Sequence, residues 1–248
     1  MMMCKAYVEN GAKVYVVSRK KAACDTVANA LNKMDAPGSA ISYPADVGSN
    51  KGCVQLAADI GALESKIDVL VNNAGLTWGG PFDKFPEEAW AKVFNLNVTT
   101  LFQLSRAFVP LLKKASLGNI DPSHIINVSS VAGNNDSSSP FDVAPSYAAS
   151  KAAANKVTQS LAAFLVKDHI NVNCIAPAVF PSKMTYNYQL KTDAGRDMSD
   201  QMHPVGRIGN ASDMAGLTIF LSTKASAFVT GSIIRLDGGM SSIQRSNM

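Results

Sequence analysis

The stretch Ile67-Asp68-Val69-Leu70-Val71-Asn72-Asn73-Ala74-Gly75 decides the fold class of this chain. It begins as a short run rich in β-branched residues with little polar alternation, and it ends in two amides and a glycine. A strand of this kind is buried on both faces, which is typical of a parallel sheet covered by helices on each side. Polar residues at the carboxyl end of such a strand face the crevice in which α/β proteins bind their ligands.

Similar runs recur along the chain, and longer helical stretches lie between them. Further strands are expected at 14–17, 41–43, 125–128, 172–175 and 233–236. Helices are expected at 22–34, 52–63, 87–114, 148–167 and 211–222. This alternation predicts an α/β fold with a Rossmann-type, doubly wound parallel sheet, in a single domain over residues 1–248.

The front of the chain departs from the usual pattern of a nucleotide-binding sheet. Such a sheet normally opens with a strand, a glycine-rich turn and a helix whose N-terminus holds the pyrophosphate. Here residues Met1 to Asn10 look like that helix. We therefore expect a domain that is incomplete at its N-terminus and lacks the first strand and the glycine-rich turn.

Composition excludes several classes of protein. The chain has 248 residues, of which 47% are hydrophobic and 17% charged, so it is not disordered. It contains no run of eighteen apolar residues, and its first residues lack the apolar segment of a secretory signal. The net charge of +4 is mild and scattered, which argues against nucleic acid. Four widely spaced cysteines indicate free thiols in a reducing, cytoplasmic setting, and the three histidines show no metal-ligand spacing.

The sharpest chemical signal is Tyr147-Ala148-Ala149-Ser150-Lys151. A tyrosine and a lysine four residues apart at the start of a helix present their side chains on one face. A nearby ammonium favours the phenolate and lowers the pKa of the phenol, as a general acid or base near neutral pH requires. Alone, this spacing occurs by chance in many helices, so its neighbours decide its meaning.

Those neighbours form an ordered set of short motifs. They are Asn72 to Gly75, Asn97-Val98, Ser129-Ser130, Tyr147 to Lys151, Pro177-Ala178 and Leu236 to Gly239. In this order the chain resembles the short-chain dehydrogenase/reductase family from Tyr7 to Met240. The usual Pro-Gly of that family is Pro177-Ala178 here, which is tolerable only where the second residue needs no positive φ.

The resemblance implies four catalytic residues. Tyr147 would donate a proton to a carbonyl or accept one from an alcohol, and Ser130 would polarise the substrate oxygen, with Ser129 as the less favoured neighbour. Lys151 would bind the nicotinamide ribose and depress the pKa of the tyrosine. Asn97 would hold a water that connects Lys151 to a proton relay.

The resemblance also implies a cofactor site. Its expected residues lie at the carboxyl ends of the strands and on the nicotinamide side: Asp46, Val47, Asn73, Ala74, Gly75, Tyr147, Lys151, Pro177, Val179 and Ser182. At the end of the 14–17 strand the chain reads Ser18-Arg19-Lys20-Lys21, with no carboxylate for a ribose 2′-hydroxyl. Because Arg19 suits a 2′-phosphate, NADP is favoured over NAD.

Three functions remain open at this point. The first is an NADP-dependent oxidoreductase that interconverts a small-molecule carbonyl and a secondary alcohol, assembled as a homodimer or homotetramer. The second is a truncated, non-catalytic relative with impaired cofactor binding. The third, a nucleotide-sugar epimerase, would need a larger C-terminal domain. Substrate selection is expected at residues 77–81 and in a lid over residues 184–203, and Trp90 and Phe94 are expected in the core or at a subunit interface.

Overall fold

Six parallel strands form the centre of the molecule in the computed structural model, which describes residues 1–134, 144–188 and 190–241. They are β1 (Lys13–Ser18), β2 (Ser39–Pro44), β3 (Val69–Asn72), β4 (Ser123–Val128), β5 (Ile170–Pro177) and β6 (Ile233–Leu236). Each strand overlaps one predicted from the sequence. All four pairings between neighbouring strands are parallel, which confirms the α/β fold with a Rossmann-like sheet.

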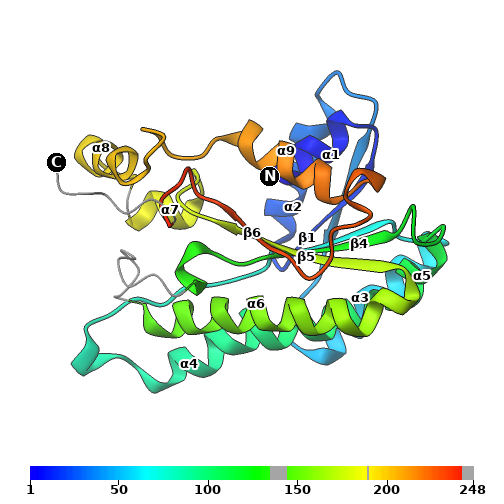
Figure 1. Ribbon diagram of the computed structural model, residues 1–248, viewed down its shortest axis with the longest axis horizontal. Coiled ribbons are helices and arrows are strands. Elements are labelled where there is room, and N and C mark those ends of the chain that lie inside the picture. Colours follow the sequence, from blue (N-terminus) through cyan, green and yellow to red (C-terminus); the bar gives the residue numbers. More distant parts are fainter. Residues whose placement is uncertain (135–143, 189, 242–248) are drawn as a thin grey trace.

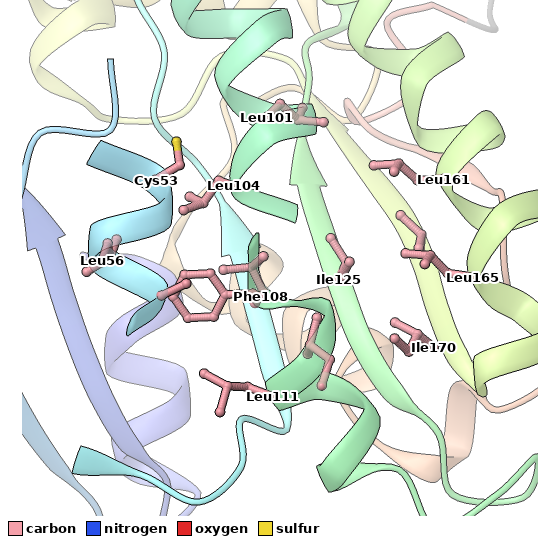
Figure 2. Close-up of a cluster of buried hydrophobic side chains, with 14 of the residues drawn as sticks. Cys53, Leu56, Leu101, Leu104, Phe108, Leu111, Ile125, Leu161, Leu165 and Ile170 are labelled. Carbon is pink, nitrogen blue, oxygen red and sulfur yellow. The ribbon is translucent and has the colours of Figure 1, made fainter. Parts of the chain in front are cut away.

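Helices cover both faces of this sheet (Figure 1). One face carries α1 (Met2–Glu9), α2 (Lys21–Asn32) and α9 (Ala211–Leu221), and the other carries α3 (Asn50–Leu63), α5 (Thr100–Ala115) and α6 (Pro145–Leu165). Three further helices complete the fold: α4 (Glu87–Phe94), α7 (Lys183–Tyr188) and α8 (Asp193–Met202). Figure 2 shows the larger core, in which Phe108 and Leu56 pack beside Ile125 and Ile170.

The strands are joined in two separate groups. β1 pairs only with β2, whereas β3, β4, β5 and β6 form a four-stranded sheet in that order. Over the described residues, no backbone hydrogen bond joins β1 to β3. We refer to this place as the sheet interruption.

The expectation that the first strand is lacking is not supported. A helix does occupy the front of the chain, but β1 follows it at Lys13–Ser18 as the first strand. The departure from a regular sheet lies instead between β1 and β3, where neighbouring strands are not hydrogen-bonded. The loop after β1 contains Ser18, Arg19 and Lys20 and no glycine, so it offers no glycine-rich turn.

The stretch predicted as one helix over 87–114 is divided. An α-helix from Glu87 to Phe94 passes into a π-helical turn over Asn95–Thr99 and then into α5. Asparagine is a poor former of α-helix, and π turns insert one extra residue into a helix, often at functional sites. The turn places two asparagine side chains where they reach neighbouring loops. In the part of the chain that is described, no helix is both long enough and apolar enough to cross a membrane.

Candidate active site

Tyr147 and Lys151 lie on the first turns of α6, which begins at Pro145. Proline suits the first helical position because its missing N–H needs no partner there. Tyr147 is 8% exposed and Lys151 is 5% exposed. The Lys151 Nζ donates a hydrogen bond to the carbonyl of Val128 at 2.9 Å and lies 5.5 Å from the centre of the Tyr147 ring. The spacing read from the sequence therefore brings both groups together at the carboxyl end of β4.

Burial controls the protonation of this pair. It raises the pKa of Tyr147 above that of an ordinary phenol, while a hydrogen bond shared with the Ser130 side chain opposes the rise. Burial also lowers the pKa of Lys151 to about 8, and the neighbouring Cys174 side chain partly opposes this fall. The resemblance implies a lowered pKa for Tyr147, but the pKa is raised here, because the loss of hydration outweighs the hydrogen bond to Ser130. At neutral pH the phenol holds its proton and can donate it.

The two serines after β4 have different partners. Ser129 donates its hydroxyl to the carbonyl of Lys151 at 2.9 Å and is 4% exposed. Ser130 accepts from the N–H of Ala132 at 3.2 Å and shares a hydrogen bond with Tyr147. Ser130 is therefore the serine whose hydroxyl lies beside the phenol, and Ser129 ties the end of β4 to α6.

Asn97 uses its amide to bind backbone and helix. Its Oδ1 accepts from the N–H of Leu76 at 2.9 Å, and its Nδ2 donates to the carbonyl of Leu76 at 3.0 Å and to Ser150 Oγ at 2.9 Å. Ser150 in turn donates to the carbonyl of Tyr147 at 2.7 Å. Both amide hydrogens are thus committed, so a water bound by Asn97 would have to use its backbone or the second lone pair of Oδ1.

The same π turn also holds the loop after β2. Asn95 Nδ2 donates to the carbonyl of Gly48 at 2.8 Å, and Thr100 Oγ1, at the start of α5 directly after the turn, donates to the carbonyl of Val47 at 3.0 Å. The turn therefore contacts the loops after β2 and β3, which are two of the loops that carry expected cofactor residues. The sequence predicted a role for Asn97 and none for Asn95, although both belong to Asn95-Leu96-Asn97 and both are unfavourable in an α-helix.

Beneath the loops, a line of buried polar side chains connects β3, β4 and α6. Asn72 Nδ2 donates to Ser105 Oγ and to Asn127 Oδ1, both at 2.8 Å, and Asn127 Nδ2 donates to Thr158 Oγ1 at 2.9 Å. All four are at most 6% exposed. We call Asn72, Asn127 and Thr158 the amide ladder. It fixes the strand end that leads into Asn73-Ala74-Gly75.

The expected adenosine-side residues lie at the carboxyl ends of β1, β2 and β3, and all but one of them are exposed. Arg19 is exposed, and within the described chain its guanidinium makes no hydrogen bond or ion pair. Asp46 is exposed and accepts from the N–H of Gly48 at 3.0 Å, whereas Val47 is half-buried. Asn73 and Ala74 are exposed too.

The nicotinamide-side residues follow β5. Val179 is 1% exposed and its carbonyl accepts from the N–H of Gly209 at 2.9 Å, whereas Pro177 is half-buried and Ser182 is exposed. Among the described residues other than glycine only His169 has a positive φ, so Ala178 is unstrained where the family usually has glycine. Residues 184–203, expected as a lid, contain most of α7 and all of α8.

The residues present fit the ribose and nicotinamide end of such a cofactor. A side chain at Gly75 would meet Asn97 Oδ1 at 3.2 Å and Lys151 Nζ at 3.5 Å, so its absence leaves the backbone open beside the buried ammonium. Lys151 has three donors, and only the Val128 carbonyl accepts from them in the described chain. The fit to the pyrophosphate of such a cofactor is weaker, because the loop after β1 has no glycine to let the backbone approach it closely.

Comparisons with known proteins agree with this geometry. Residues 2–241 match the family described as enoyl-(acyl carrier protein) reductase, so the match does not support a chain that is incomplete at its N-terminus. A rhamnolipid-biosynthesis 3-oxoacyl-[acyl-carrier-protein] reductase of Pseudomonas aeruginosa is 38% identical over 238 residues, which is 96% of this chain and 90% of the relative. Galactitol 2-dehydrogenase (L-tagatose-forming) of Cereibacter sphaeroides is 30% identical over 96% of this chain and 88% of its own.

Two solved structures extend the comparison to the cofactor. The RhlG/NADP active-site complex of Pseudomonas aeruginosa has a TM-score of 0.90 at 37% identity, covering 96% of this chain and 90% of that one. A gluconate 5-dehydrogenase of Burkholderia cenocepacia in complex with NADP and tartrate has a TM-score of 0.86 at 26% identity, covering 98% and 91%. Both relatives were therefore solved with NADP.

Proposed function

Because this chain belongs to the short-chain dehydrogenase/reductase family, whose members oxidise alcohols or reduce carbonyls, we propose that it is an NADP-dependent oxidoreductase with Tyr147 as its general acid and base. The observation that carries the proposal is the buried group of Tyr147, Ser130 and Lys151 at the carboxyl end of β4. The homologous structures with NADP support the choice of cofactor.

The chemistry follows from the protonation of these groups. NADPH, when bound, supplies the hydride. Ser130 donates a hydrogen bond to the carbonyl oxygen of the substrate and polarises it. Tyr147, which holds its proton at neutral pH because burial raises its pKa, delivers that proton to the oxygen as negative charge develops. In the reverse direction the same phenol oxygen accepts the proton of the alcohol.

Lys151 and Asn97 support this proton transfer without contacting the substrate oxygen. The Lys151 ammonium lies between the Val128 carbonyl and the tyrosine ring, where it would bind ribose hydroxyls and stabilise a phenolate. Asn97 positions the loop at Leu76 and the first turn of α6 through Ser150. Arg19 would bind the 2′-phosphate, and Asp46, Val47 and Asn73 to Gly75 would line the adenosine.

The test is a pair of tyrosine variants. Tyr147→Phe should reduce turnover of a carbonyl panel with NADPH by about 10³-fold, since general acid catalysis contributes on the order of 10²–10⁴. Its affinity for NADPH, measured by fluorescence titration, should stay within about threefold of the parent, because the phenyl ring is kept. Tyr7→Phe is the matched control, since Tyr7 bonds Ser222 between α1 and α9, away from the site. Turnover by Tyr147→Phe equal to that of the parent would refute the assigned role.

A second candidate, a non-catalytic relative with impaired cofactor binding, is favoured by the glycine-free loop after β1. Backbone N–H groups in a glycine-rich turn approach a pyrophosphate more closely than side chains can. The same titration separates the two functions. Saturable NADPH binding in the low micromolar range, together with turnover of any member of the panel, rejects the second candidate.

We also propose that the chain self-associates through the outer surface of α4 and α6. Trp90 is 41% exposed and stacks on Phe94 at 5.9 Å between ring centres, and Phe164 on α6 is 67% exposed. Large apolar side chains that remain in water favour an interface. Phe164→Glu should shift the mass measured by light scattering toward the monomer, with the neighbouring exposed change Lys167→Glu as its control. A monomeric parent protein would contradict this part of the proposal.

A further inference from the structure

Asn155 lies in the middle of α6, and the proton transfer described above does not use it. Its side chain is half-buried, and its amide bonds to two other parts of the fold. The Nδ2 donates to the carbonyl of Gly133 and to Oδ1 of Asn134, both at 3.3 Å. The Oδ1 accepts from the thiol of Cys174 on β5 at 3.6 Å. Asn155 therefore joins α6 both to β5 and to the segment that follows β4.

The orientation of this amide follows from its partners. A backbone carbonyl can only accept, so the Asn155 amide must turn its Nδ2 toward Gly133. Its Oδ1 then faces β5, where it needs a donor. The Cys174 thiol can serve as that donor, because burial raises its pKa to about 11 and it keeps its proton at neutral pH. The side chain thus reaches the segment after β4 in one defined orientation.

Two bonds to α6 bracket Ser130. Before it in the chain, Ser129 Oγ donates to the carbonyl of Lys151 at 2.9 Å. After it, the carbonyl of Gly133 accepts from Asn155. Ser130 itself opens a short 3₁₀ turn, which Gly133 closes with a hydrogen bond from its N–H to the Ser130 carbonyl at 3.0 Å. The place of this turn on the helix is therefore set at both of its ends.

The turn also lies directly against the backbone of α6. A Cβ at Gly133 would lie 2.5 Å from the carbonyl carbon of Lys151 and 2.7 Å from the nitrogen of Ala152. This contact prevents the turn from moving closer to the helix, and the bond from Asn155 keeps it from moving away. Because Tyr147 belongs to the same helix, a turn that is fixed on α6 is fixed relative to the phenol as well.

From these contacts we propose that Asn155 is a positioning residue, which holds the Ser130 hydroxyl beside Tyr147 by fixing the turn after β4 on α6. Its effect on turnover rests on the proposed function, in which Ser130 polarises the substrate oxygen. A displacement of about 1 Å in a catalytic group can lower a rate on the order of 10²-fold, so two hydrogen bonds to this turn are enough to matter.

The test is a double-mutant cycle on kcat. Asn155→Leu keeps the size of the side chain and removes its donor, so kcat with NADPH and the carbonyl panel should fall about ten- to a hundredfold, with the KM for NADPH within about threefold of the parent. Ser130→Ala should lower kcat by about 10²–10³-fold. The double variant should be at most about twofold slower than Ser130→Ala, because no hydroxyl then remains to be positioned. Asn155→Gln keeps the amide donor and should recover most of the lost turnover.

Gln159→Leu is the matched control. Gln159 is exposed on the same helix and forms no hydrogen bond within the described residues, so this change should leave kcat as it is in the parent. Residue-resolved amide hydrogen exchange of the free protein gives a second readout. The amides of Gly133 and Asn134, which bond back into the turn, should exchange about fivefold faster or more in Asn155→Leu, whereas that of Ile126 within β4 should not change.

Three results would overturn the assignment of Asn155. They are turnover by Asn155→Leu equal to that of the parent, a double variant slower than Ser130→Ala by the full factor seen for Asn155→Leu alone, and unchanged exchange at Gly133. Turnover by Ser130→Ala equal to that of the parent would instead refute the proposed function, and with it the role of Asn155, whatever the exchange experiment shows.

Discussion

Replacing Asn97 by alanine should destabilise the protein far more than replacing Asn95, its neighbour in the same π turn. The Asn97 side chain is 2% exposed and makes three hydrogen bonds, two to the backbone of Leu76 and one to Ser150. A buried hydrogen bond contributes about 1 kcal/mol net, so Asn97→Ala should lower the free energy of unfolding by about 3 kcal/mol. For a chain of this size that corresponds to a fall in Tm of about 6–12 °C.

Urea unfolding followed by circular dichroism measures the effect, with thermal unfolding as a second readout. Asn95→Ala is the matched control, because its single side-chain bond to Gly48 is exposed, and it should cost about 0.5 kcal/mol. Asn97→Ala within about 1 kcal/mol of the parent would refute the reasoning, and so would equal losses from the two variants.

Three further predictions concern the site. Burial lowers the pKa of Lys151 to about 8 in the folded protein, against 10.5 for the free side chain. Between these two pH values the Lys151 amine is therefore more protonated in the unfolded chain than in the folded one. The unfolding free energy of the parent should therefore rise relative to Lys151→Met between pH 8 and pH 10, and a flat difference in pH-dependent urea titrations would contradict the shift. Asn95→Ala frees the loop at Gly48, so it should raise the KM for NADPH about three- to tenfold with kcat little changed; an effect on kcat alone would disprove a role in this loop. Gly133→Ala places a methyl group 2.5 Å from the Lys151 backbone carbonyl carbon, which should cost about 2–3 kcal/mol in unfolding free energy, and a variant as stable as the parent would show that α6 can move.

The strands were predictable because both their faces are covered. A strand buried on both sides needs a continuous apolar run, and the runs at 125–128 and 172–175 lie within β4 and β5. The proximity of Tyr147, Lys151 and Ser130 was predictable for a related reason. Tyr147 and Lys151 are close in sequence and adjacent on one helix, and the serines directly end a strand.

Other features depend on contacts between distant segments, which no local pattern contains. The bond from Asn95 to Gly48 spans 47 positions, and the π turn that directs it interrupts a stretch whose composition still suits an α-helix. The irregularity at the front was interpreted from the sequence as a missing strand, whereas the structure places it between β1 and β3. Strand pairing depends on how the whole sheet assembles.

The pKa of Tyr147 shows a different limit of sequence reasoning. The presence of Lys151 one turn away favours a lower value, and this much is visible in the sequence. The depth of burial is not visible there, and it reverses the sign of the shift. Both residues are correctly paired in the sequence analysis, and only their environment differs.

The amide ladder has a consequence for how the chain reaches its fold. Asn72 stands directly opposite Asn127 in the parallel register of β3 and β4. If the two strands slipped by one residue during folding, Val71 would face Asn127, and every side chain of β3 would move to the opposite face. Asn72 would then lose both of its side-chain partners and Asn127 would lose one of two, a penalty of several kcal/mol in a misaligned state that is otherwise just as apolar. The amide ladder thus favours one register of β3 and β4 over other compact arrangements. A protein without it should still collapse readily, but a larger share of its molecules should pair these two strands in the wrong register.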